Sequence, residues 1–327
     1  MRSINWGIMS TGTIAKKFAG TISRLTDTGK VLAVASRSMA TAAAFAAEHG
    51  APRAYGDYVE LVRDADIDVV YVATPHSHHY ENARLCLEHG KHVLCEKSFT
   101  VNAAQAAELI RLAREKRLFI MEAFWTKFLP AYGLLAGELA GGAIGAVTHF
   151  RAQYGFAPTG ARYVRKFDPA LAGGALLDIG VYALGVAAMV LGYRPAALHA
   201  KAIMGEYGTD MFDSMMLEYE SGATAHLVTT IGSVIPTEAA IFGTEGRIVL
   251  PEFTALQEFT VVAGGGERTV KAPFEVNGFE YQIRETERCL RAGLTESPVM
   301  THEQTLAVMG MMDTARAQWG LRFPGEK

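Results

Sequence analysis

The sequence has few cysteines and no long run of basic residues. Its three cysteines, Cys86, Cys95 and Cys289, fit neither the spacing of a zinc site nor a disulfide framework, which is typical of a reducing cytoplasm. The formal net charge of -3 and the missing basic stretch give no reason to expect a nucleic-acid partner. We therefore expect a cytoplasmic protein that acts on a small molecule.

Long apolar runs are also missing, with one exception. The segment from Ala175 to Gly192 is the longest apolar stretch, but it contains Asp178 and several glycines, so we expect a buried loop and helix instead of a membrane span. Met1 to Trp6 leads directly into a strand-like segment, so no signal peptide is expected. A length of 327 residues favours about two domains, which we place at residues 1–123 and 124–327.

The first residues have the pattern of a nucleotide-binding unit. The apolar run Ile4–Met9 predicts a buried strand, and Lys16–Leu25 predicts a helix after a tight turn. In such a unit a glycine, here Gly12, lets the backbone approach a pyrophosphate. Ser10 stands where the first glycine of the fingerprint is usual, so a plain strand-turn-helix stays an alternative. The residues expected at the pyrophosphate are Ser10, Thr11, Gly12, Thr13 and Ile14.

The end of the second strand indicates which nicotinamide cofactor is used. An enzyme that uses NAD places Asp or Glu here for the ribose 2′-hydroxyl, but no carboxylate occurs between Thr28 and Ala47. Instead, Arg37 offers a planar cation for a 2′-phosphate, and Ser36 and Ser38 offer hydroxyls. This pattern favours NADP(H) over NAD(H), with a solvated surface arginine as the alternative.

A histidine-rich turn follows the third buried strand, Val69–Ala73. A loop at the carboxyl end of a parallel strand lies where such proteins bind their cofactor. No cysteine or carboxylate with suitable spacing lies close by, so no metal is expected. His78 is expected to be exposed. The residues expected to face the cofactor or substrate are Thr74, Pro75, His76 and His79.

Lys97 stands at the end of a further buried strand, within Cys95-Glu96-Lys97-Ser98. A desolvated lysine can lose its proton near neutral pH and exchange protons with a substrate hydroxyl while hydride moves to or from a nicotinamide. Farther along the chain, Asp178 and Tyr182 are four residues apart and share a face if their segment is helical. The carboxylate can hold the charge of the lysine, and the phenol can donate a proton to a developing alkoxide. The alternatives are a surface lysine, an N-capping aspartate and a core tyrosine.

The second half of the chain changes to longer, alternating segments. These segments predict a C-terminal α+β domain with a large, mostly antiparallel open-faced sheet. The N-terminal domain is expected to be a Rossmann doubly wound parallel sheet, so the whole chain falls in the α/β class. Apolar residues on both faces of one strand indicate that the open face is buried in a dimer, with a covering helix as the alternative. The expected strands are Val147–Tyr154, Leu198–Met204, Asp213–Tyr219, Ala223–Ile231, Ala239–Phe242, Arg247–Leu250 and Phe259–Val262, and the expected last helices are Tyr281–Arg291 and His302–Trp319.

Five motifs occur in order along the chain. They are Gly7–Gly12, Thr74–His79, Glu96-Lys97, Glu122–Thr126 and Gly173–Tyr182. Together they resemble the glucose-fructose oxidoreductase/inositol dehydrogenase (Gfo/Idh/MocA) family. Within that family the chain is most similar to the dimeric dihydrodiol dehydrogenases, which also act as NADP-dependent D-xylose dehydrogenases. The resemblance covers nearly the whole chain.

The resemblance implies a Rossmann domain followed by an open-faced sheet domain that forms a homodimer. It also implies that Lys97 is catalytic, that Asp178 and Tyr182 lie beside the reacting carbon, and that Arg37 lies at the 2′-phosphate. Ser98 replaces the proline that usually follows the lysine in this family, so the sequence does not predict the backbone conformation at this position. Further residues expected at the cofactor are Glu96, Lys97 and Trp125. The residues expected at the substrate are Lys97, Trp125, Tyr154, Asp178, Tyr182 and Phe279.

The predicted function is that of an NADP(H)-dependent oxidoreductase. It would transfer hydride between the nicotinamide and a secondary alcohol or carbonyl of a sugar, polyol or cyclic trans-diol. Lys97 and Tyr182 would handle the hydroxyl proton, and Asp178 would orient Lys97. The alternatives are an NAD-dependent inositol or sugar dehydrogenase and a non-catalytic, ligand-sensing regulator on the same fold. The first is disfavoured by the missing acid after the second strand, and the second by the presence of Lys97 and its partner.

Overall fold

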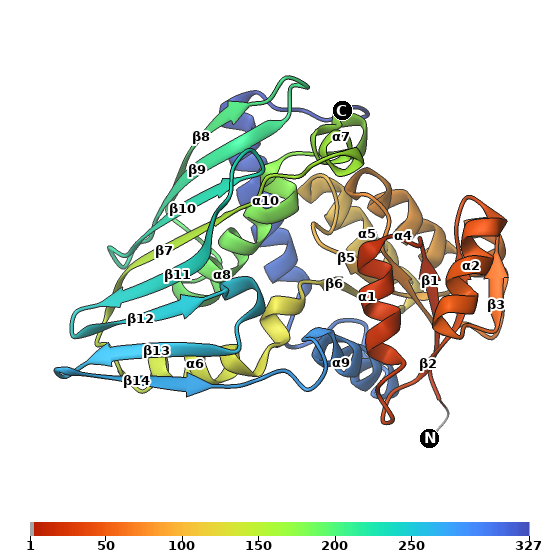
Figure 1. Cartoon of the computed structure of the whole chain (residues 1–327), viewed down its shortest axis with the longest axis horizontal. Coiled ribbons are helices and arrows are strands. Elements are labelled where there is room, and N and C mark those ends of the chain that lie inside the picture. Colours follow the sequence, from red (N-terminus) through yellow and green to blue (C-terminus); the bar gives the residue numbers. More distant parts are fainter. Residues whose placement is uncertain (1–2, 327) are drawn as a thin grey trace. The chain divides into compact units, whose positions relative to one another are not determined.

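The computed structural model describes residues 3–326, and the side chains of all of these except residues 161–163. The chain divides into two compact units, which are described separately below (Figure 1). Unit 1 comprises Met1–Trp125 and Glu275–Thr305, and unit 2 comprises Thr126–Phe274 and Leu306–Lys327. The segment Glu275–Thr305 therefore groups with the first part of the chain, whereas the predicted second domain includes it.

Unit 1 contains a six-stranded sheet in the order β3-β2-β1-β4-β5-β6, with all neighbours parallel. This confirms the predicted Rossmann doubly wound sheet. The strand order reverses between β1 and β4, and ligands of such sheets bind outside the carboxyl ends of the strands at this point. The strands are β1 (Asn5–Met9), β2 (Lys30–Ala35), β3 (Arg53–Tyr55), β4 (Val69–Val72), β5 (His92–Glu96) and β6 (Ile120–Ala123).

Helices connect these strands. The first helix begins directly after Gly12, three residues before the predicted start. Strand β3 was not predicted, because its three half-buried residues give no periodic signal. The helices are α1 (Thr13–Ile22), α2 (Met39–His49), α3 (Tyr58–Arg63), α4 (His79–Glu88), which follows the short helix η1 (His76–His78), and α5 (Ala103–Lys116).

Helix α9 (Phe279–Arg291) joins unit 1 through a buried carboxylate, although it comes late in the sequence. Glu287 has no exposed surface and accepts hydrogen bonds from Trp6 Nε1 at 2.9 Å and from the Gly29 N–H at 2.6 Å. Arg291 of the same helix pairs with its second oxygen at 2.6 Å. A Cβ on Gly29 would lie 1.9 Å from the carbonyl oxygen of Ile4, so only glycine lets the chain approach here. The contact ties α9 to the start of β1.

Unit 2 contains an eight-stranded sheet in the order β14-β13-β12-β11-β7-β10-β9-β8. Neighbours β7 and β10 are parallel, and all other neighbours are antiparallel. The mostly antiparallel sheet and the hairpin across Ser221-Gly222 are confirmed, whereas β14 was not predicted. The strands are β7 (Val147–Gly155), β8 (Ala197–Met204), β9 (Asp210–Glu218), β10 (Thr224–Thr230), β11 (Ile235–Gly243), β12 (Gly246–Pro251), β13 (Glu258–Ala263) and β14 (Gly266–Lys271).

Helices cover one face of this sheet, and the other face is open (Figure 1). Helix α8 (Val181–Leu191) packs on β7 and β10, and α6 (Pro130–Ala140) packs on β13 and β14. On β7, Phe150 and Ala152 are buried, while Arg151 between them is exposed. The remaining helical segments are η2 (Trp125–Phe128), α7 (Ala161–Phe167), η3 (Pro169–Leu171), the π-helical turn η4 (Leu176–Gly180), η5 (Phe253–Ala255) and α10 (His302–Trp319), of which Leu306–Trp319 belongs to unit 2.

The segment Pro169–Leu191 is long and apolar enough to cross a membrane by length and composition alone, with a mean hydropathy of 2.0. In this structure 83% of its most apolar window is buried. The segment comprises η3, η4 and α8, and every described residue from Ala172 to Ala188 is buried. The predicted buried loop and helix are therefore confirmed.

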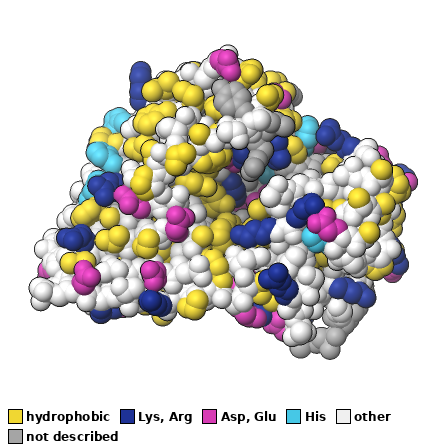
Figure 2. All heavy atoms as spheres, viewed as in Figure 1, with side chains coloured by type: hydrophobic (Ala, Val, Ile, Leu, Met, Phe, Trp, Pro, Cys, Tyr) yellow, Lys and Arg dark blue, Asp and Glu magenta, His cyan; other side chains and the backbone are white. Residues whose placement is uncertain are grey.

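Charged side chains are mixed over the face of the molecule that Figure 2 shows. Lysine and arginine side chains lie among aspartate and glutamate side chains there, instead of gathering in one area. This distribution agrees with the small net charge of -3.

Candidate active site

The turn after β1 has the geometry of a pyrophosphate-binding loop. Ser10 has a φ of 98°, in the left-handed region that favours glycine, and its N–H donates to the carbonyl of Ala35 at 2.9 Å. A Cβ on Gly12 would meet only Ser10 Oγ, at 3.8 Å, so there is open space in front of the loop. Helix α1 begins at the next residue and has no acidic residue in its first turn. Its positive end therefore suits an anion such as a pyrophosphate.

The turn after β2 presents Arg37 to solvent. Arg37 and Ser38 are exposed and Ser36 is half-buried. In the described part of the chain, Arg37 has no carboxylate partner. Ser38 also caps α2, because its hydroxyl accepts the Thr41 N–H at 3.5 Å. The guanidinium of Arg37 is thus available for a phosphate.

The side chains of the histidine-rich turn after β4 differ in their exposure to solvent. Pro75 and His76 are half-buried, and His78 is exposed, as predicted. His79, by contrast, has no exposed surface. Its ring nitrogens lie 2.8 Å from the Ser98 carbonyl and 2.7 Å from the Thr74 carbonyl. The imidazole joins the loops after β4 and β5, and burial lowers its pKa to about 4. The predicted contact of His79 with a cofactor stays a prediction.

Lys97 lies at the carboxyl end of β5, half-buried, and its peptide bond to Ser98 is cis. Two buried carboxyl groups are close to it, Glu96 and Glu122, and the positive charge of Lys97 stabilises the ionised form of both. Burial opposes that effect and raises the pKa of Glu96, and it raises the pKa of Glu122 to about 7. The lysine therefore lies beside two acids within unit 1.

Hydrogen bonds fix both of these acids. Glu96 accepts from the Tyr71 hydroxyl at 2.5 Å and from the Lys97 N–H at 3.3 Å. Glu122 accepts from the Thr305 hydroxyl at 2.9 Å and from the backbone of Phe99. Glu96 is 4% exposed and belongs to this network, and its predicted contact with the cofactor stays a prediction.

A lysine and two aromatic rings form a cluster next to Glu96. The rings of Trp125 and Phe279 are 5.3 Å apart, and Lys17 Nζ lies 4.2 Å from each ring centroid. Burial lowers the pKa of Lys17, and the charges of Glu96 and Glu280 oppose this shift. Cation–π contacts of this kind stabilise a partly desolvated ammonium group. Phe279 has no exposed surface and contacts Trp125 and Lys17 within unit 1. Its predicted place in the substrate pocket stays a prediction.

The carboxylate of Glu280 organises the loop that precedes α9. It accepts the backbone N–H groups of all four residues before Phe279, at distances from 2.7 to 3.1 Å. A concave set of N–H groups around an anion is a strongly stabilising arrangement. The residues concerned are Glu275, Val276, Asn277 and Gly278. The loop that delivers Phe279 is thus fixed by one side chain.

Unit 2 brings together three of the predicted residues. Asp178 lies in the π-helical turn η4, and Tyr182 lies one turn later in α8; both are buried, at 7% and 9% exposed. The ring of Tyr154 is 6.4 Å from that of Tyr182. Asp178 forms an ion pair with Lys166 at 2.5 Å. The charge partner of Asp178 within its own unit is therefore Lys166, and its predicted pairing with Lys97 stays a prediction.

Comparison with known proteins gives the family. Residues 4–124 match the model of an oxidoreductase family with an NAD-binding Rossmann fold, and residues 135–249 match the GFO/IDH/MocA C-terminal domain. The trans-1,2-dihydrobenzene-1,2-diol dehydrogenase of Xenopus tropicalis is 38% identical over 98% of this chain and 99% of its own length. The same enzyme of Mus musculus is 36% identical over 99% of both chains. The chain belongs to the Gfo/Idh/MocA oxidoreductase family.

Solved structures agree with this family. A 3-ketoreductase from Actinomadura kijaniata, in complex with TDP-benzene and NADP, has a TM-score of 0.85 and 26% identity, covering 96% of this chain and 97% of that one. An aldose-aldose oxidoreductase from Caulobacter crescentus has the same fold, with a TM-score of 0.88 at 23% identity, covering 98% and 99%. As a member of the family, the chain is an NAD(P)-dependent oxidoreductase.

Sequence reasoning missed three charged residues at the candidate site, namely Lys17, Glu122 and Lys166. Glu122 could have been selected, because it opens one of the five family motifs. Lys17 gave no signal beyond its place in a helix. Lys166 lies in a stretch whose course the sequence does not predict. No group of three or more side chains that could hold a metal ion occurs among the described residues.

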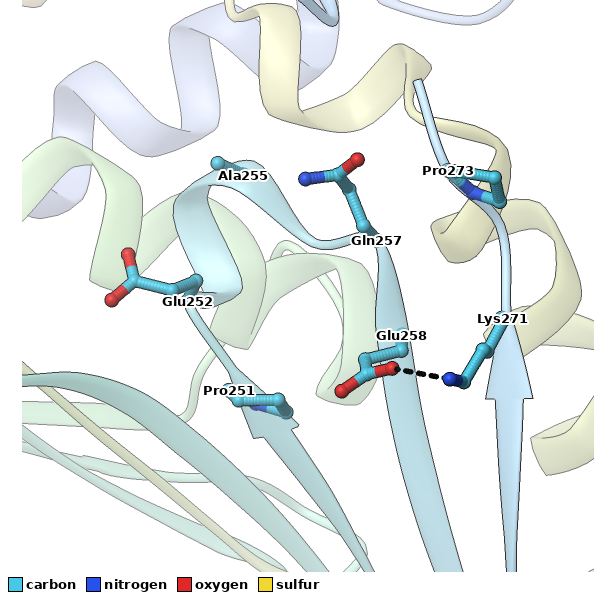
Figure 3. Close-up of a pocket in the computed structure, with 7 residues that line it drawn as sticks. All are labelled: Pro251, Glu252, Ala255, Gln257, Glu258, Lys271 and Pro273. Carbon is cyan, nitrogen blue, oxygen red and sulfur yellow. Dashed lines mark ion pairs between the residues drawn. The ribbon is translucent and has the colours of Figure 1, made fainter. Parts of the chain in front are cut away.

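Unit 2 also contains an open groove of about 470 Å³ (Figure 3). It lies beside β13 and β14, and an ion pair of 3.7 Å joins Glu258 and Lys271 along it. No residue of the predicted site lines it. The lining residues are Pro251, Glu252, Ala255, Gln257, Glu258, Lys271 and Pro273.

The buried imidazole of His79 predicts a loss of stability in acid. Because its pKa is lowered from 6.5 to about 4 in the fold, the unfolded chain binds a proton first as the pH falls through 6.5. The free energy of unfolding should then decrease by about 2 kcal/mol from this group between about pH 7 and pH 5. Urea denaturation of His79→Gln should show a smaller decrease than the wild type. The exposed control, His78→Gln, should retain the wild-type dependence, and equal slopes for all three proteins would contradict the assignment.

Proposed function

We propose that this protein is an NADP(H)-dependent dehydrogenase that acts on a secondary alcohol of a sugar, polyol or cyclic trans-diol, or on the matching carbonyl. The observation that carries the proposal is Lys97, half-buried beside Glu96 and Glu122 at the carboxyl end of β5. The substrate class follows the relatives, since dihydrodiol dehydrogenases match the chain over nearly its whole length. D-Xylose belongs among the candidate substrates.

Arg37 supports the choice of NADP(H). Its exposed guanidinium follows β2, where the adenosine ribose lies in such folds, and it has no carboxylate partner among the described residues. A 2′-phosphate would be bound by a planar fork of N–H donors, with the Ser36 and Ser38 hydroxyls nearby. The nicotinamide, when bound, supplies or accepts the hydride.

The chain's own groups handle the proton of the substrate hydroxyl. We assign this proton to Lys97 and Tyr182, the two groups with acid-base chemistry among the predicted catalytic residues. Glu96 and Glu122 set the electrostatic surroundings of Lys97. Lys166 balances the charge of Asp178, so this carboxylate can orient a neighbouring group without the cost of a buried unpaired charge.

The open face of the unit 2 sheet supports a homodimer. Along one row across the sheet lie His199, Met216, His226 and Arg151, all at least partly exposed. His226 packs edge-on against His149, with centroids 5.4 Å apart. We propose that a second copy covers this face. The three cysteines, all free and buried, fit the proposed cytoplasmic location.

The function is tested by turnover. Purified protein should oxidise or reduce at least one member of a panel of D-xylose, inositols, trans-dihydrodiols and matching carbonyls, read as NADPH absorbance. Lys97→Met should lower kcat on the order of 10²–10⁴-fold, since it removes a general acid-base group, while the Kd for NADPH stays within a factor of about three, below the tenfold of a 1.4 kcal/mol loss. Lys116→Met, at an exposed lysine, is the control. Undiminished turnover by Lys97→Met would refute its role.

Cofactor preference is tested by direct binding. Replacing Arg37 with Ala should raise the Kd for NADPH about 10–100-fold, the worth of a charged hydrogen bond to a phosphate. The Kd for NADH should change little. Arg24→Ala, at another exposed arginine, should alter neither value. Tighter binding of NADH than of NADPH by the wild type would show that Arg37 has a different role.

The dimer is tested by sedimentation. The wild type should sediment as a dimer, and His226→Glu should shift the population toward monomer because it buries a charge in the proposed interface. Glu220→Gln, in the exposed turn after β9, should leave the population unchanged. A wild type that stays monomeric at every concentration would rule out this interface.

A further inference from the structure

Two aspartates of strand β9 are buried and have no part in the proposed chemistry. Asp210 is 1% exposed and Asp213 is not exposed at all. A carboxyl group in such surroundings needs hydrogen-bond partners or must bind a proton, because burial disfavours its charged form. Their contacts show which part of the molecule they serve.

Asp210 holds the beginning of the π-helical turn that carries Asp178. Its Oδ2 accepts the Leu176 N–H at 2.6 Å, and the backbone of Ala175 also bonds to this carboxylate. Gly174, just before the turn, has a φ of 123°. A Cβ at this glycine would lie 2.2 Å from Asp210 Oδ1, so only glycine admits the carboxylate here. The Gly173-Gly174 motif thus has a physical reason.

Asp213 binds Thr229 of strand β10, which packs on the same turn. Its Oδ2 accepts the Thr229 hydroxyl at 3.0 Å. A Cβ on Gly180, the last residue of the turn, would lie 3.4 Å from Thr229 Oγ1. Asp210 therefore supports the start of the segment Leu176–Gly180, and Asp213 holds Thr229 of a strand that packs on this segment. The segment leads directly into α8 and Tyr182. Single π-helical turns occur often at functional sites.

The remaining oxygens of the two aspartates lie buried without another donor. Asp210 Oδ1 and Asp213 Oδ1 have no hydrogen-bond donor in the described part of the chain. The two carboxyl groups lie three residues apart on β9, and the charge of Asp210 acts on Asp213. Two ionised carboxylates cannot share such a site, whereas one carboxyl group donating to one carboxylate satisfies both. Burial raises the pKa of Asp210 to about 6, and burial together with the Asp210 charge raises the pKa of Asp213 well above its usual range.

Among the described residues of β8 and of the segment before the turn, no other charged group is shown to interact with this pair. On strand β8, the residues paired with Asp213 and Asp210 are Ala202 and Met204, which carry no charge. On the segment before the turn, Lys166 pairs with Asp178 at 2.5 Å. Asp168 on that segment accepts the Ala170 N–H at 2.9 Å instead.

We propose that Asp210 and Asp213 are positioning residues that share one proton and thereby hold the turn bearing Asp178, and Tyr182 after it, in its working arrangement. This inference rests on the proposed function of Asp178 and Tyr182. The shared proton belongs to the hydrogen bond between the two carboxyl groups. Its loss leaves two negative charges in contact, which drives the carboxylates apart and releases the backbone of Leu176.

The first test is the pH dependence of stability, which needs no substrate. Asp213→Asn keeps a donor toward Asp210 and an acceptor for Thr229, but it has no shared proton to lose. Both pKa values are raised in the fold, so the wild type binds more protons folded than unfolded, and its stability falls as the pH rises above about 4. The urea midpoint of Asp213→Asn should therefore rise relative to the wild type between pH 5 and pH 8. Glu220→Gln is the control. A difference that does not change with pH would overturn the shared proton.

The second test separates positioning from folding. Asp213→Asn should keep kcat within a factor of about three of the wild type at pH 7, below the tenfold that a 1.4 kcal/mol loss would give. The ratio of its kcat to that of the wild type should rise as the pH increases from 7 to 9, because only the wild type has a shared proton to lose. Asp210→Ala, which removes the acceptor for Leu176, should lower kcat at least tenfold with an unchanged Kd for NADPH in unit 1. Wild-type kcat in a folded Asp210→Ala protein would overturn the positioning role. If the wild type turns over no panel substrate, the proposed function fails, while the stability comparison still decides the shared proton.

Discussion

The ammonium group of Lys97 is half-buried at the end of a strand whose other residues are mostly out of contact with water. The charge of Lys97 acts on two buried acids, Glu96 and Glu122, and favours their ionised forms against the effect of burial. These acids in turn need donors, which Tyr71 of β4 and Thr305 at the end of the second segment of unit 1 supply. The demand for charge balance at one lysine therefore connects strands β4, β5 and β6 with a segment nearly two hundred residues later.

Buried carboxylates with several hydrogen-bond or charge partners also attach other segments to their units. Glu287 binds Trp6 and Gly29 and so attaches α9 to β1. Glu280 gathers four backbone N–H groups and fixes the loop before that helix. In unit 2, Asp178 lies in the turn whose start Asp210 binds, and it pairs with Lys166. A buried carboxylate left unpaired is costly, so each of these acids specifies one arrangement of the backbone around it.

Much of the fold could be predicted because its signals are local. Apolar runs such as Val31–Ala35 are the mark of parallel strands covered on both faces, and the sequence separates them by segments of helical pattern. Individual site residues were harder to predict. His76 and His79 look alike in the sequence, but His76 is half-buried, whereas His79 is fully buried with both ring nitrogens against carbonyl groups of two different loops. The family resemblance implies that Phe279 lines the substrate pocket, but it does not predict the contacts of this ring with Lys17 and Trp125.

The sequence by itself was enough to predict the class of protein and the order of the apolar strands. It was also enough to identify the glycine turn after β1, the absence of an acid after β2 and the lysine after β5. Each of these depends on residues that are close together in the chain, so pattern and spacing are enough. The tertiary structure alone decided which charges meet: Glu122 beside Lys97, Lys166 with Asp178, and Asp210 with Asp213. Such pairs join residues of different elements, and their energies depend on distance and burial, which a linear pattern does not contain.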